Sequence, residues 1–105
     1  VDIVIATEFL SKYENGYVFS EKELRELFWQ GISGTYIGNF IQRNDNEDVY
    51  HKIYRVNNRY IALRMRMAYV EAEDDHRCYE KRIIFDLQPI EFELDKIGGK
   101  FRNGL

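Results

Sequence analysis

The sequence predicts an α+β fold, in which two N-terminal helices pack on one face of a four- to five-stranded antiparallel meander sheet. The spacing of apolar residues is helical up to Gly31 and changes to a period of two from Thr35 onward. The second part is also rich in β-branched and aromatic residues, which are typical of strands. A chain of 105 residues is long enough for one hydrophobic core. We therefore expect a single domain over residues 1–97 and a frayed, glycine-rich tail over 98–105.

The two predicted helices have recognisable start and stop signals. After a short strand or extended lead-in, the first helix is expected over residues 7–14, because Asn15-Gly16 accepts the left-handed conformation that ends helices. The second helix begins after Ser20, since Ser20 and Glu23 have the spacing of a capping box. Gly31 is expected to end it.

The sheet is predicted from a hairpin signal at its centre. Asn57-Asn58 lies between two alternating segments, and asparagine tolerates the positive φ of a tight primed turn. Outer strands are expected over residues 36–43 and 79–87, joined to the hairpin by polar loops. Pro89 marks a break, after which residues 90–94 are expected to form an edge strand beside the N-terminal segment.

The two-residue turn determines which side chains share a face of the sheet. It places Tyr54 opposite Ile61 and Lys52 opposite Leu63, on the face that the helices are expected to cover. The outer strands are expected to add Ile37, Ile41, Ile83, Phe85 and Leu87 to that face. The opposite face is expected to be open and to carry Tyr36, Phe40, Val49, His51, Ile53, Arg55, Tyr60, Ala62, Arg64, Arg66, Arg82, Ile84 and Asp86.

Composition and charge argue against several classes of protein. The net charge of -3, from 15 Lys and Arg against 18 Asp and Glu, is not that of a dedicated nucleic-acid binder. No segment approaches the roughly 20 consecutive apolar residues that span a bilayer, so no membrane partner is expected. The single cysteine, Cys78, cannot form an internal disulfide, which favours a reducing compartment such as the cytoplasm. No metal or other cofactor is expected, since zinc requires about four well-placed ligands.

The mixture of aromatic and basic residues on the predicted open face favours a binding function. Tyr, Phe and Arg are enriched at the centres of protein interfaces. The predicted binding residues are Tyr36, Phe40, Arg55, Tyr60, Arg64 and Arg66, together with an acidic loop that contains Glu71, Glu73, Asp74 and Asp75. We therefore expect a small, non-enzymatic protein-binding module. One form of it is a phage- or plasmid-type inhibitor of a nucleic-acid-handling defence enzyme, which blocks a surface or imitates a phosphate backbone with its acidic loop.

The alternative is a nucleic-acid-binding or RNA-cleaving domain that uses the same face. His51, Arg64 and Asp86 fall in one predicted row, which would combine a proton-transfer group, a cation for a phosphoryl transition state and an orienting carboxylate. The simpler interpretation is an ion pair between Arg64 and Asp86 beside a solvated histidine. A homodimer that forms through the edge strand at 90–94 is also left open.

Overall fold

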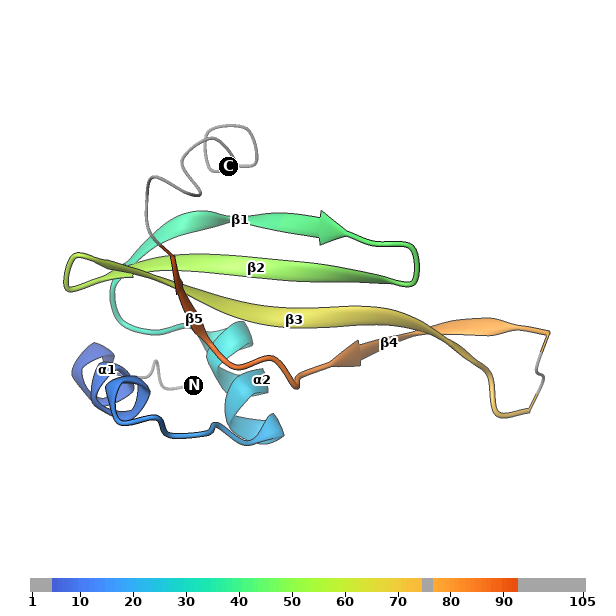
Figure 1. Ribbon diagram of the computed structural model, residues 1–105, viewed down its shortest axis with the longest axis horizontal. Helices are drawn as coiled ribbons and strands as arrows, with labels where there is room; N and C mark the ends of the chain where they lie inside the picture. The colour runs from blue at the N-terminus through green and yellow to red at the C-terminus, as the bar shows by residue number, and fades with distance from the viewer. Residues whose placement is uncertain (1–4, 75–76, 93–105) are drawn as a thin grey trace.

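The structure, a computed structural model, describes residues 5–74 and 77–92. Within these residues two helices come first and five strands follow (Figure 1). Their bounds are α1 Ala6–Glu14, α2 Glu21–Gln30, β1 Thr35–Arg43, β2 Glu47–Val56, β3 Arg59–Glu71, β4 Tyr79–Ile84 and β5 Ile90–Phe92. The strands form one antiparallel sheet in the order β1-β2-β3-β4, and β5 pairs with the same edge of β3 as β4 does. The predicted α+β class is confirmed, whereas the predicted tail lies outside the described residues.

Local hydrogen bonding and backbone conformation account for the start of α2 and for the ends of both helices. The Ser20 hydroxyl accepts the Glu23 backbone N–H at 3.2 Å, and the Glu23 carboxylate accepts the Ser20 N–H at 3.0 Å, so the predicted capping box is present. Gly16 and Gly31, with φ angles of 73° and 84°, follow the two helices and accept conformations that other residues rarely adopt. The predicted helix boundaries are confirmed to within about one residue.

The central hairpin has the predicted turn and the predicted register. Asn57 and Asn58 have φ angles of 49° and 65°, and two successive positive values are characteristic of a type I′ turn. Tyr54 lies opposite Ile61, as the two-residue turn requires. Local turn chemistry therefore fixes the alignment of β2 with β3.

A bulge in β1 reverses the predicted facing of its first residues. Tyr36 lies opposite Tyr54, whereas Gly38 lies opposite Ile53, so Ile37 is an extra residue on the β1 side. The Tyr36 ring packs 5.4 Å from the Tyr54 ring, on the face that carries the helices. Ile37 packs instead against Ile53 on the other face. The predicted positions of Tyr36 and Ile37 are both wrong, because one inserted residue reverses the alternation.

The edge strand is interrupted earlier than predicted. β4 ends at Ile84 because Phe85 leaves the sheet and enters the core beneath the helices, where its ring lies 5.9 Å from that of Phe28. The chain rejoins the sheet as β5, in which Ile90 lies opposite Ala62 of β3. The predicted strand over 79–87 therefore ends three residues early. The edge strand beyond Pro89 is present and pairs with β3. Residues 1–4 of the N-terminal segment, beside which it was expected, lie outside the described residues.

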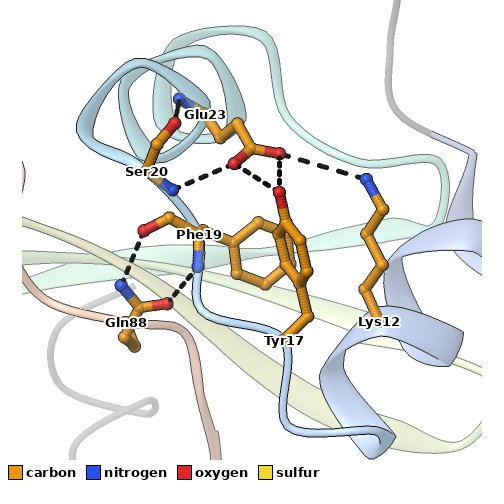
Figure 2. A network of polar contacts seen from close by, with 6 residues as sticks. All are labelled: Lys12, Tyr17, Phe19, Ser20, Glu23 and Gln88. Atoms are coloured by element: carbon orange, nitrogen blue, oxygen red, sulfur yellow. Dashed lines mark hydrogen bonds and ion pairs between the residues drawn. The ribbon is translucent and has the colours of Figure 1, made fainter.

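Side-chain hydrogen bonds hold the interrupted segment against the loop between the helices (Figure 2). The Gln88 amide donates to the Phe19 carbonyl oxygen at 2.9 Å and accepts the Phe19 N–H at 2.8 Å. Beside it, the Glu23 carboxylate accepts the Tyr17 hydroxyl at 2.7 Å. The backbone N–H of Ser20, with the Tyr17 hydroxyl, holds the pKa of Glu23 below its ordinary value. This network fixes the start of α2 relative to the edge of the sheet.

Apolar clusters lie on both faces of the sheet. The cluster beneath the helices consists of Phe9, Leu10, Phe19, Leu24, Leu27, Phe28, Ile32, Val56, Ile61, Leu63, Met65 and Phe85. On the opposite face Ile53 and Ala62 are 0% exposed. Their partly buried neighbours are Ile37, Phe40, Tyr60 and Ile90. The expectation of an open face is therefore wrong at the centre of this face, where Ile53 and Ala62 are buried and Ile37, turned there by the bulge, and Ile90 of β5 pack against them.

Candidate functional site

The two central arginines of the predicted binding face already have acceptors within the protein. Arg66 donates to both carboxylate oxygens of Asp86, at 2.8 and 2.7 Å, and to Glu47 at 2.5 Å. Arg64 donates to the backbone carbonyl oxygen of Gln88 at 2.7 Å. The predicted pair of Arg64 with Asp86 is wrong, because β4 ends before it reaches Asp86.

The predicted catalytic row is only partly assembled. His51 lies between Phe40 and Arg64 in register, as predicted. Its imidazole stacks on the Phe40 ring, with the centroids 4.2 Å apart and the planes 8° from parallel, and is only 4% exposed. The predicted solvated histidine is therefore wrong. Its burial leaves little access for a substrate. Asp86 is engaged with Arg66 instead of this row.

The remaining predicted binding residues do not form one surface. Arg55 and Tyr60 lie opposite one another near the β2–β3 turn. The acidic residues lie at the far end of β3 and beyond it, and those that the structure describes are all exposed: Glu71, Glu73 and Asp74. Asp75 lies outside the described residues. Within the described ranges, no group of three or more His, Cys, Asp and Glu side chains is placed to hold a metal ion.

The lengths of the elements leave part of the helix-bearing face uncovered. Helices α1 and α2 have 9 and 10 residues, which is about 15 Å of helix each. Strand β3 has 13 residues, which is about 43 Å of strand. Figure 1 shows the helices near the β2–β3 turn, while β1, β3 and β4 extend well beyond them.

No helix among the described residues has both the length and the apolar character needed to cross a membrane.

An apolar hollow of about 360 Å³, here named the overhang groove, lies where the sheet extends past α2. Its walls include Trp29 of α2, Ile41 of β1, Met67 of β3 and Ile83 of β4. Trp29 is 55% exposed, Ile83 51% and Ile41 38%. The expectation that the helices cover Ile41 and Ile83 is therefore wrong. Apolar side chains exposed together in one hollow are typical of interaction sites.

Lys52 supplies a positive charge at the inner end of the overhang groove. Its ammonium donates to the Phe28 carbonyl oxygen at 2.9 Å and lies 4.5 Å from the Phe28 ring centroid and 5.1 Å from that of Trp29. Partial burial lowers the pKa of Lys52 below its ordinary value. In the described part of the chain, no carboxylate forms an ion pair with this ammonium. The groove therefore combines an apolar lining with one partly desolvated cation.

No protein-family model, curated protein or solved structure matches this chain. The sequence predicts Ile41 and Ile83 on a face that the helices cover, although the short helices and long strands are a signal that part of this face would stay uncovered.

Proposed function

We propose that this chain is a small non-enzymatic module that binds another protein through the overhang groove. The observation that carries the proposal is the exposure of Trp29, Ile41 and Ile83 around one hollow. Trp29 and Ile41 are held by α2 and β1, so little ordering of this part of the lining is required when a partner binds. Tryptophan and methionine are enriched at the centres of protein interfaces, and burial of the apolar lining would favour association.

Nucleic-acid binding and cleavage are less well supported. The net charge is -3, and Arg64 and Arg66 are engaged with internal acceptors rather than presented to phosphates. The stacking of Phe40 over His51 leaves little access for a substrate. These contacts favour a protein partner over a polyanion.

Three narrower expectations, about the kind of partner, the compartment and the oligomeric state, also belong to the proposal. An inhibitor of a nucleic-acid-handling enzyme would use the overhang groove for affinity, while the exposed acidic loop with Glu71, Glu73 and Asp74 imitates phosphates. Action in the cytoplasm stays an expectation from the single cysteine. A homodimer through the segment that contains β5 is a second arrangement that sizing experiments would detect.

The proposal is tested by changing one wall of the groove. Ile83→Asp places a charge in the lining, whereas Val18→Asp makes the same kind of change at a side chain that is 74% exposed and does not line the groove. The native chain and both variants are used to capture proteins from nuclease-treated bacterial lysate, after thermal melts establish that all three are folded. We expect the native chain and Val18→Asp to capture the same protein in stoichiometric amount. Ile83→Asp is expected not to capture it.

Two results would contradict this proposal. The first is a captured protein that Ile83→Asp retains as well as the native chain does. The second is recovery of nucleic acid alone when nuclease is omitted, and loss of that nucleic acid with the variant Arg55→Glu. Arg55 is chosen because it is exposed on the opposite face of the sheet. The second result would favour the nucleic-acid alternative.

A further inference from the structure

The charge at the inner end of the overhang groove indicates what kind of segment binds there. We infer that the occupant is an acidic, apolar peptide segment of the partner, whose carboxylate pairs with Lys52 while a neighbouring apolar side chain fills the space between Trp29 and Ile83. This inference rests on the proposed protein-binding function and specifies the chemistry of the partner.

Lys52 has more hydrogen-bond donors than it has acceptors among the described residues. An ammonium has three N–H donors, and among the described residues this one has a single acceptor, the Phe28 carbonyl oxygen at 2.9 Å. The rings of Phe28 and Trp29 occupy further space around the ammonium. A partly buried cation without a carboxylate is costly, and an incoming carboxylate would offset that cost.

A second cation lies on the same face of the sheet as Lys52. Lys81 shares a face of β4 with Ile83 and adds a second cation, with its ammonium 5.5 Å from the Tyr69 ring. The carboxylate of Asp48 is already paired with Arg43 at 3.3 Å. Among the described residues that line the groove, Lys52 is a cation and none is a carboxylate, which favours an acidic segment over a basic one.

The apolar lining of the groove begins directly beside the cation. The Trp29 ring centroid lies 5.1 Å from the Lys52 ammonium, and the same side chain forms part of the groove wall. A segment that pairs with Lys52 therefore brings its adjacent residue against Trp29 and, across the hollow, Ile83. A segment in which an aspartate or glutamate adjoins an apolar residue therefore makes both contacts. The carboxylate pairs with Lys52, and the apolar side chain packs against Trp29 and Ile83.

Selection of short random peptides displayed on phage tests the inference directly. Parallel selections use the native chain, Lys52→Met, Lys52→Arg and Ile83→Asp as immobilised targets. The native chain and Lys52→Arg are expected to enrich peptides in which Asp or Glu adjoins Leu, Ile or Phe. Lys52→Met keeps most of the apolar stem, so it is expected to enrich apolar peptides without the acidic residue.

Titration in solution measures how much the peptide carboxylate contributes to the binding affinity. Trp29 is the only tryptophan in the chain, so its fluorescence reports occupancy of the groove by a synthetic enriched peptide that lacks tryptophan. Replacement of the peptide carboxylate by its amide is expected to raise Kd about tenfold for the native chain and hardly at all for Lys52→Met. The difference between the two chains isolates the contact between Lys52 and the carboxylate.

The outcomes separate this inference from the proposed function. If folded Ile83→Asp enriches the same peptides as the native chain, or the native chain enriches none, the groove is not a protein-binding site and both proposals fail. If apolar peptides are enriched without an acidic residue, the proposed function stands and this inference fails. The inference also fails if the amide peptide loses as much affinity for Lys52→Met as for the native chain.

Discussion

Gly31, which ends α2 next to Trp29, is expected to be among the positions least tolerant of substitution. Its φ of 84° and ψ of -175° lie in a region that is essentially restricted to glycine, and other residues there cost about 1–3 kcal/mol. A Cβ atom at this position would also lie 2.5 Å from the Tyr54 hydroxyl oxygen and 3.2 Å from Cζ of the same ring. With both costs present, Gly31→Ala should lower the free energy of unfolding by about 3 kcal/mol.

Gly16 provides the matched control for this substitution. It also has a positive φ, of 73°, but a Cβ atom there would meet nothing within 4 Å. Gly16→Ala should therefore carry only the conformational cost, of about 1 kcal/mol. Urea unfolding of both variants measures the difference, which a thermal melt should report as a further fall in Tm of about 10 °C for Gly31→Ala.

The variant Tyr54→Phe separates the steric cost from the conformational one. It removes the hydroxyl oxygen that the Cβ atom introduced by Gly31→Ala would approach, so this substitution should be less damaging in the Tyr54→Phe background by about 1 kcal/mol. A steric clash with Tyr54 is ruled out if Gly31→Ala costs no more than Gly16→Ala, or if the effects of Gly31→Ala and Tyr54→Phe add to within about 0.5 kcal/mol.

Three further predictions concern the ion pair, the edge segment and the groove. The hydrogen bonds from Arg66 lower the pKa of Asp86, so the stability from this carboxylate is present above its ordinary pKa of about 4 and is lost as the pH falls below that value. The difference in unfolding free energy between the native chain and Asp86→Asn should therefore narrow in acid, and a constant difference would contradict the assignment. Gln88→Leu removes both hydrogen bonds to Phe19 and should cost about 2 kcal/mol in urea unfolding, with Gln88→Glu intermediate because it keeps the acceptor. Acrylamide should quench Trp29 readily in the folded chain, and strong shielding of its fluorescence would contradict an exposed groove wall.

The correctly predicted parts of the fold depend on interactions within a few residues. The capping box at Ser20 and the turn at Asn57-Asn58 are local, and they are sufficient to place α2 and to align β2 with β3. The bulge at Ile37 was missed, although Gly38, whose φ is 152°, is a residue type that often marks such irregularities within strands. The early end of β4 depends on packing with the distant α2 helix, which no local pattern reports.

The candidate site was missed for a related reason. Alternation assigns side chains to a face but does not say how far along that face a second layer extends. Ile41 and Ile83 were correctly placed on the helix-bearing side, yet they lie beyond the reach of the helices. The internal partners of Arg64 and Arg66 come from segments remote in sequence, so alternation alone overstated the basic character of the opposite face.

The exposed position of β4 has a consequence for the dynamics of the overhang groove. Five of its six residues are exposed, so separation of β4 from β3 would uncover little additional apolar surface. The free energy of local opening is low for such a segment. The backbone amides of β4 should therefore exchange with solvent faster than those at the centre of β3. The groove thus has a firm floor on β2 and β3 and one wall that can shift at low cost. Its width can therefore adapt to side chains of different size without disturbance of the core.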